Sequence, residues 1–93
     1  MYLRLVRSTL SAAGRSSAQA MADDLIPRIK QQPGWQSAAF FAGDDGSRGL
    51  AVLWDTHEHA DAASAVIRPQ LDQHLSGNVS APPEVRLFPV LAS

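Results

Sequence analysis

Two apolar runs joined by a short turn constrain the fold of this chain more than any other feature. Residues 38–41 and 50–54 are apolar throughout, and the segment 43–49 between them reads Gly-Asp-Asp-Gly-Ser-Arg-Gly. Glycine and aspartate tolerate the backbone conformations of tight turns, so this segment predicts a hairpin turn. The centre of the chain is therefore predicted to be two antiparallel strands, Trp35–Ala42 and Gly49–Trp54.

The segment before this hairpin carries a strand signal and then a helix signal. Apolar and charged positions alternate over 1–7, so residues 2–9 are predicted to form a strand, and the small polar residues of 11–17 predict a loop. Ser16 or Ser17 can cap a helix that runs to about Gln32.

Two proline positions bear on this first helix. Pro27 falls inside it, where a proline removes a hydrogen bond and costs about 3 kcal/mol, so we expect a kink or a break into two short helices. Pro33-Gly34 is predicted to end the helix, because glycine supplies a left-handed cap.

A second helix and a final strand follow the hairpin. Asp55 can cap the helix, with Glu58 in the capping-box position. Pro69 predicts a separate turn ending near Gly77, and Val85–Leu91 is predicted to be a strand whose Pro89 indicates a sheet edge or a bulge. The predicted inward face of the helix carries Ala60, Ala63, Val66 and Ile67.

The resulting order is β-α-β-β-α-β, which is the ferredoxin-like arrangement. We therefore predict an α+β fold, an antiparallel sheet of four strands with both helices on one face. Strands two and three are apolar at consecutive positions. A sheet with one face exposed to water should instead show alternating apolar and polar residues along each strand. Because the chain has no segment left to cover the second face, we expect a homodimer that packs sheet against sheet.

Composition supports a single domain over residues 1–93 and excludes several classes of protein. The chain has no cysteine and a net charge of −1, with its basic residues scattered, so we expect no disulfide, no thiolate metal site and no nucleic-acid surface. No apolar stretch approaches the roughly 20 residues that span a bilayer, and the N-terminus does not read as a signal peptide. We therefore expect a cytoplasmic protein without membrane contact.

Short motifs resemble a known family. Pro33-Gly34-Trp35 leads into strand two, and Leu53-Trp54-Asp55-Thr56 leads into the second helix. With Ile26-Pro27 and the element order, these motifs make nearly the whole chain similar to the antibiotic-biosynthesis-monooxygenase-like family. The resemblance implies a dimeric α+β barrel and activities that include cofactor-free oxidation of anthrone-type polyketide intermediates by O₂, quinol oxidation and haem degradation.

The resemblance places Trp54 at the family's tryptophan, which lines the cavity between sheet and helices. Packing logic alone allows either a core residue or a pocket wall at this position. The haem-degrading branch also has an asparagine in strand one and a later histidine. Strand one has no asparagine here and the later position is Ser64, so haem degradation is not expected.

The remaining candidate site residues are chosen for their chemistry. A neutral His59 could accept a proton from a phenol, since the ordinary histidine pKa is about 6.5. His57 and His59 lie two apart on a helix and point to different faces, so we expect no metal site. Arg7 and Arg86, on strands expected to be neighbours, could hold an anionic oxygen, with surface ion pairs as the alternative. Phe40 and Phe41 could wall the pocket with Trp54.

Two functions follow from the sequence. The first is a cofactor-independent monooxygenase acting on a small aromatic, quinol or polyketide-like substrate, with Trp54 and His59 as catalytic candidates and Phe40, Phe41, Arg7 and Arg86 as substrate-binding ones. The second is a non-catalytic protein that binds a small hydrophobic or aromatic molecule, or a partner, on the same barrel. A cavity of about 300 Å³ or more favours the enzyme, and a filled interface favours packing.

Overall fold

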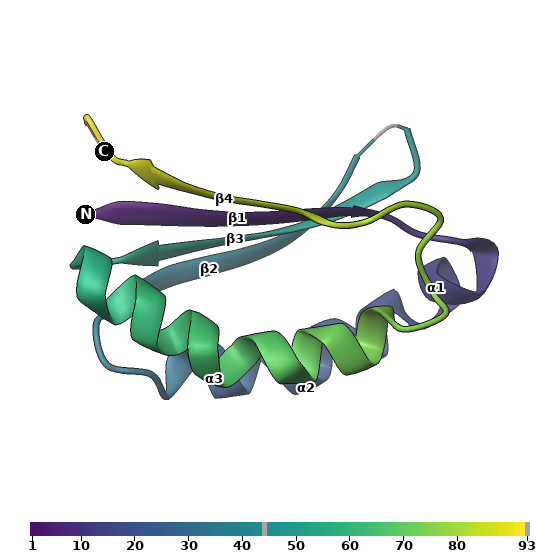
Figure 1. Ribbon diagram of the computed structural model, residues 1–93, viewed down its shortest axis with the longest axis horizontal. Helices are drawn as coiled ribbons and strands as arrows, with labels where there is room; N and C mark the ends of the chain where they lie inside the picture. The colour runs from purple at the N-terminus through teal and green to yellow at the C-terminus, as the bar shows by residue number, and fades with distance from the viewer. Residues whose placement is uncertain (44, 93) are drawn as a thin grey trace.

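The strands and long helices follow one another along the chain in the β-α-β-β-α-β order that the sequence predicts (Figure 1). The computed structural model describes residues 1–43 and 45–92, so Asp44 of the predicted turn lies outside the described residues. The elements are β1 (Tyr2–Thr9), α1 (Ala12–Ser16), α2 (Ala18–Lys30), β2 (Trp35–Ala42), β3 (Ser47–Trp54), α3 (His57–Leu75) and β4 (Glu84–Pro89).

The strands form one antiparallel sheet in the order β2-β3-β1-β4. Helices α2 and α3 lie side by side below the sheet in Figure 1, with α2 packed on β2 and α3 packed on β1 and β3. The predicted ferredoxin-like fold is confirmed, and α1 is an addition to it.

The strand register divides the sheet residues between two faces. Residues paired across antiparallel strands share a face, and successive residues alternate. Arg4 pairs with Val52 on the side that faces α2 and α3. The helix face carries Arg4, Val6, Ser8, Ala38, Phe40, Leu50, Val52, Trp54, Val85 and Leu87; the open face carries Leu3, Leu5, Arg7, Ala39, Phe41, Gly49, Ala51, Leu53, Arg86 and Phe88.

The hydrophobic core lies between the helix face and the two long helices. Leu25 and Ile29 of α2 are almost wholly buried, as are Val52 of β3 and Ala60 of α3. Val66, predicted to face inward, is instead 55% exposed, because its neighbour Ile67 occupies the buried stripe of α3. Among the described residues, no helix combines the length and apolar character needed to cross a membrane.

The predicted loop over 11–17 is wrong in one respect, because most of it is the short helix α1. Ser11 caps this helix, and its Oγ accepts a hydrogen bond from the backbone N–H of Gly14 over 3.2 Å. Gly14 packs against the backbone of Asn78, where a Cβ would collide with the Asn78 carbonyl oxygen. Ser17 is the N-cap of α2, as predicted, although its side chain makes no capping bond.

Neither internal proline ends a helix. Pro27 lies within α2 and Pro69 lies within α3. Of the two outcomes expected at Pro27, a kink or a break, the break is therefore wrong, and so is the separate turn predicted after Pro69. An internal proline costs about 3 kcal/mol. Beyond Pro69, however, Leu71 and Leu75 are buried, and each contributes roughly 1.5–3 kcal/mol. Core packing therefore outweighs the loss of one helical hydrogen bond.

The remaining boundaries differ by a few residues. Thr56, not Asp55, caps α3, with its Oγ1 accepting from the backbone N–H of His59 over 3.1 Å. Strand β3 begins at Ser47, before the predicted Gly49, and β4 spans Glu84–Pro89 instead of Val85–Leu91. The strand β4 is at the sheet edge, as its proline predicts.

Candidate functional site

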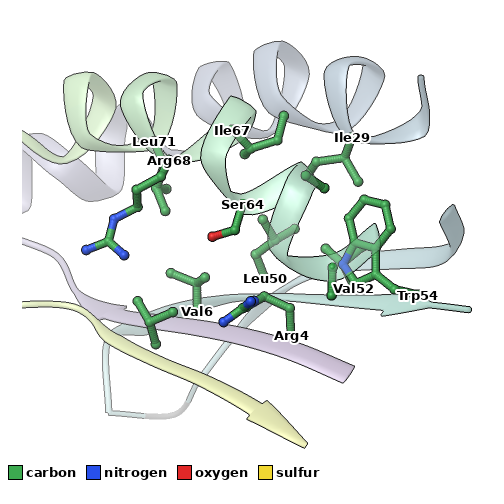
Figure 2. A pocket seen from close by; sticks show the side chains of 13 residues that line it. Arg4, Val6, Ile29, Leu50, Val52, Trp54, Ser64, Ile67, Arg68 and Leu71 are labelled. Atoms are coloured by element: carbon green, nitrogen blue, oxygen red, sulfur yellow. The ribbon is translucent and has the colours of Figure 1, made fainter. Parts of the chain in front are cut away.

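A narrow cleft lies between α3 and the helix face of the sheet (Figure 2). Its volume is about 40 Å³, well below the roughly 300 Å³ that would favour an enzyme pocket. Three polar side chains, those of Arg4, Ser64 and Arg68, contribute to its lining. The other lining residues are Val6, Ile29, Leu50, Val52, Trp54, Ala60, Ala63, Ile67, Leu71 and Val85.

Trp54 forms one end of the cleft. It is the last residue of β3, pairs with Tyr2 across the sheet and is only 3% exposed. Figure 2 shows its indole between the sheet and the helices, beside Val52 and Ile29. The ring therefore packs in the core and lines the cleft at once, so both interpretations of this tryptophan hold together.

The two phenylalanines proposed to wall the pocket point to opposite faces. Phe40 is on the helix face, packs against the core and lines a second cavity of about 20 Å³ with Leu25 and Leu75. Phe41 is on the open face, where its ring covers Gly49 so closely that a Cβ there would collide with it. Neither ring lines the cleft at Trp54.

The two arginines proposed to bind an anion lie on the open face. Their strands are neighbours, as expected, since β1 pairs with β4. The Arg7 guanidinium lies 3.1 Å from Asp45, and that of Arg86 lies 3.0 Å from Glu84. Both therefore form the surface ion pairs given as the alternative, on the side of the sheet away from Trp54.

His59 lies at the start of α3, and its ring is not part of the cleft lining. Its Nδ1–H donates to Oδ1 of Asp55 over 2.6 Å, and this hydrogen bond lowers the pKa of the Asp55 carboxyl. The pair packs over Gly34, whose φ of +82° and lack of a Cβ allow this close approach. The Asp55–His59 pair orients the imidazole and leaves Nε2 as its second nitrogen.

Arg4 was not predicted as a site residue, yet it lies on the cleft wall. Its Nη2 lies 3.1 Å from Oδ1 of Asp61, while its Nε is buried without a hydrogen-bond partner among the described residues. Oδ2 of Asp61 lies 3.0 Å from Nδ1 of His57, whose ring meets Tyr2 edge-on at 5.2 Å. One carboxylate thus links the arginine of the cleft to the helix start.

Ser64 and Arg68 of α3 were also missed as site residues. Figure 2 shows the Arg68 guanidinium pointing from α3 down toward the sheet and the Ser64 hydroxyl pointing away from Trp54, to the side of Arg68. Their spacing in the sequence could have indicated this. Ala60, Ser64 and Arg68 are four residues apart, so they lie along one side of the helix, and Ala60 was already predicted to face inward.

Within residues 1–43 and 45–92, no group of three or more histidines and acidic residues is arranged to hold a metal ion. Each histidine instead faces one aspartate. His57 pairs with Asp61, and His59 pairs with Asp55.

Comparison with known proteins gives a fold and no sequence family. No family model matches the sequence, and no curated protein matches it. The structure is similar to SnoaB, a cofactor-independent oxygenase from Streptomyces nogalater, with 17% identity over 99% of this chain and 94% of SnoaB and a TM-score of 0.80.

Two further solved structures agree. A monooxygenase from the gene ActVA-Orf6 of Streptomyces coelicolor, in complex with the ligand nanaomycin D, is 17% identical over 99% of this chain and 88% of its own, with a TM-score of 0.79. Rv0793 from Mycobacterium tuberculosis is 17% identical over 99% and 96%, with a TM-score of 0.85. The resemblance inferred from the sequence motifs is thus confirmed at the level of the fold: this chain has the α+β ferredoxin-like fold of antibiotic biosynthesis monooxygenases.

Proposed function

We propose that this chain is a cofactor-independent monooxygenase acting on a small aromatic, quinol or polyketide-like substrate. The observation that carries the proposal is Trp54, which lines an apolar cleft between sheet and helix in a fold shared with a cofactor-independent oxygenase. An apolar pocket with a few convergent polar groups is the usual form of a small-molecule site.

The chemistry requires only a substrate that becomes electron-rich on losing a proton. The anion of an activated CH₂ group transfers an electron to O₂, and the resulting radical pair combines into a peroxide. Loss of water from this peroxide leaves a carbonyl, so one oxygen atom enters the product and the other leaves as water. The protein contributes a dry cleft and a positive charge that stabilises the anion.

The strand register favours a different set of residues for these roles from the set chosen on the sequence alone. Trp54 provides the wall, and Arg4 takes the anion-stabilising role first given to Arg7 and Arg86, because it alone of these three faces the cleft. His59 remains the proposed proton acceptor through Nε2, with Asp55 holding the other nitrogen at 2.6 Å. Because His59 does not line the cleft, a substrate that reaches it must extend beyond the lining residues.

The proposal includes a homodimer formed through the open face. This face presents Leu3, Leu5, Ala51 and Leu53 half-buried, and Phe41 and Phe88 more exposed. A contiguous apolar patch of this kind favours a protein partner, and a second copy offers the same patch in return.

A non-catalytic small-molecule-binding protein is the second candidate. The cleft of about 40 Å³ favours it, since pockets for drug-sized ligands usually measure about 300–1,000 Å³. The lining supports it too, because its hydrogen-bonding side chains are those of two arginines and a serine, with the Trp54 indole, and none of these is a ready general base.

The test is oxygen consumption with dithranol or a quinol and no added cofactor. Trp54→Phe is expected to lower turnover at least several-fold, because it removes part of the wall that positions the substrate. Trp35→Phe is the matched control, since Trp35 lies outside the cleft lining. No oxygen uptake across a panel of phenols and quinols would favour the binding protein, and unchanged turnover on Trp54→Ala would remove Trp54 from the mechanism.

A further inference from the structure

Arg4 has hydrogen-bond donors that no described residue engages, and it lines the cleft. A guanidinium carries five N–H donors, and Asp61 engages Nη2. The Nε is buried without a partner among the described residues, although the side chain is 18% exposed. Leaving a buried N–H unsatisfied costs roughly 1–3 kcal/mol, so this position favours the arrival of an acceptor oxygen.

Arg68 and Ser64 direct further donors to the same space. The Nε of Arg68 lies 3.0 Å from Asp72, and Figure 2 shows the rest of its guanidinium pointing down from α3 toward the sheet. The Ser64 hydroxyl lies between Arg68 and Trp54 in this view and points to the side of Arg68, with the Arg4 guanidinium below it, nearer the sheet. Donors from a strand, on Arg4, and from a helix, on Ser64 and Arg68, therefore line the same cleft.

The charge within the cleft is positive. Its lining includes two arginines and no acidic residue. The partner carboxylates, Asp61 and Asp72, are more than half exposed, so water screens their charge more than it screens that of Arg4. An anion enclosed by apolar walls would interact with the guanidinium groups more strongly than it could in bulk water.

We propose that this cleft binds the acidic oxygen of a small aromatic acid or phenolate between Arg4, Ser64 and Arg68, with the aromatic ring directed toward Trp54. The proposal rests on the proposed function and narrows its substrate class from any small aromatic to an anionic one. A guanidinium suits this role because it stays charged and binds carboxylates through paired N–H donors.

Size narrows the class further. A volume of about 40 Å³ holds an acidic group but not a ring system, since a single water needs about 10–15 Å³ by the same measure. The ring must therefore widen the cleft or extend over its open side. Fused rings need more widening than one ring, so a single aromatic ring fits this site best.

Binding of 4-hydroxybenzoate and of its neutral analogue 4-hydroxybenzamide, followed by NMR titration of the full chain at pH 7, tests the proposal. The acid is expected to bind at least 10-fold more tightly than the amide. Arg4→Gln is expected to weaken binding of the acid about 10-fold or more, with under threefold change for the amide, because it removes only the charge-assisted bonds.

Arg28→Gln is the matched control. Arg28 also forms an ion pair with an aspartate four residues away, at 2.9 Å, and is 50% exposed against 44% for Arg68. It lies on α2 outside the cleft lining, so this variant should bind the acid like the parent chain. Arg68→Gln leaves the sheet intact and should weaken binding several-fold even if Arg4→Gln does not fold.

Equal affinities for acid and amide would overturn the proposal, as would an Arg68→Gln variant that behaves like Arg28→Gln. The proposed function fails separately. Selective binding of the acid without oxygen uptake from any phenol or quinol would retain the anion site and reject the oxygenase. Oxygen uptake that is indifferent to substrate charge would do the reverse.

Discussion

The two faces of the sheet differ in what covers them and therefore in what they can do. Leu50 and Leu53 lie on the same strand, three residues apart, yet Leu50 is buried beneath the helices and Leu53 is half-buried on the open face. The helix face includes a cleft with a tryptophan and an arginine on its wall. The open face has an apolar surface flanked by ion pairs, which suits contact with another protein more than chemistry.

This division sorts the candidate site residues. Trp54 and Phe40 are on the helix face, whereas Phe41, Arg7 and Arg86 are on the open face. Phe40 and Phe41 show how sharp the division is, because adjacent residues of a strand point to opposite sides. Residues of suitable chemistry therefore form a site only where the register also gives them the same face.

The largest effect is expected from Leu50→Ala. The substitution removes a buried side chain that also lines the cleft, so it should lower the free energy of unfolding by about 2–5 kcal/mol. Urea denaturation followed by circular dichroism measures the change. Leu53→Ala is the matched variant and should cost less at low protein concentration, where the open face meets water. If Leu50→Ala and Leu53→Ala lowered the free energy of unfolding equally at every protein concentration, the two faces would be equally buried in the single chain.

A charge on the open face should separate the proposed dimer. Leu53→Asp would bury an unpaired carboxylate in the apolar interface, which costs several kcal/mol, so the dimer dissociation constant should rise about 100-fold or more. Sedimentation velocity at micromolar concentration measures it. Phe88→Asp, at the edge strand and 39% exposed, should act in the same direction.

Val66→Asp is the control for this experiment, because Val66 is exposed on the outer side of α3. This variant should sediment like the parent chain. A parent chain that is already monomeric at micromolar concentration, or a Leu53→Asp variant that remains dimeric, would contradict the proposed interface.

Local patterns predicted the elements well and their ends less well. The alternation at the start of the chain and the turn residues after Ala42 are properties of short segments, so β1 and β2 have the predicted bounds. The turn predicted after Pro69 was wrong because the free-energy cost of a proline is local. The burial of Leu71 and Leu75, which offsets it, depends on a sheet that is distant in sequence. Tertiary packing decided the length of α3.

The site was harder to predict because it depends on which face each strand turns toward the helices. In β1, the apolar residues Leu3 and Leu5 flank Arg4, so from the sequence Arg4 reads as a solvent-facing position. The structure reverses this interpretation, since Arg4 lies beneath α3 and the two leucines are on the open face. The pairing of Arg4 with Val52 on one side and Leu87 on the other shows the reversal, and no single strand contains that information.

The smallest effect is expected from a pH-dependent contact on the helix side of the molecule. Asp24 of α2 accepts a hydrogen bond from Nε2 of His74 on α3 over 2.8 Å, and this bond, with help from Arg28, lowers the pKa of the Asp24 carboxyl below its ordinary 3.8. A lowered folded-state pKa adds stability at pH values above the unfolded-state pKa, and that stability is lost as the pH falls through the folded-state pKa.

Asp24→Asn should therefore be less stable than the parent chain at pH 6, with the difference disappearing below the folded-state pKa. Thermal unfolding from pH 2 to pH 6 measures it, and Asp23→Asn, on the exposed side of the same helix turn, should show no such trend. A difference between Asp24→Asn and the parent chain that is constant across this range would show that the carboxylate charge does not hold α2 against α3.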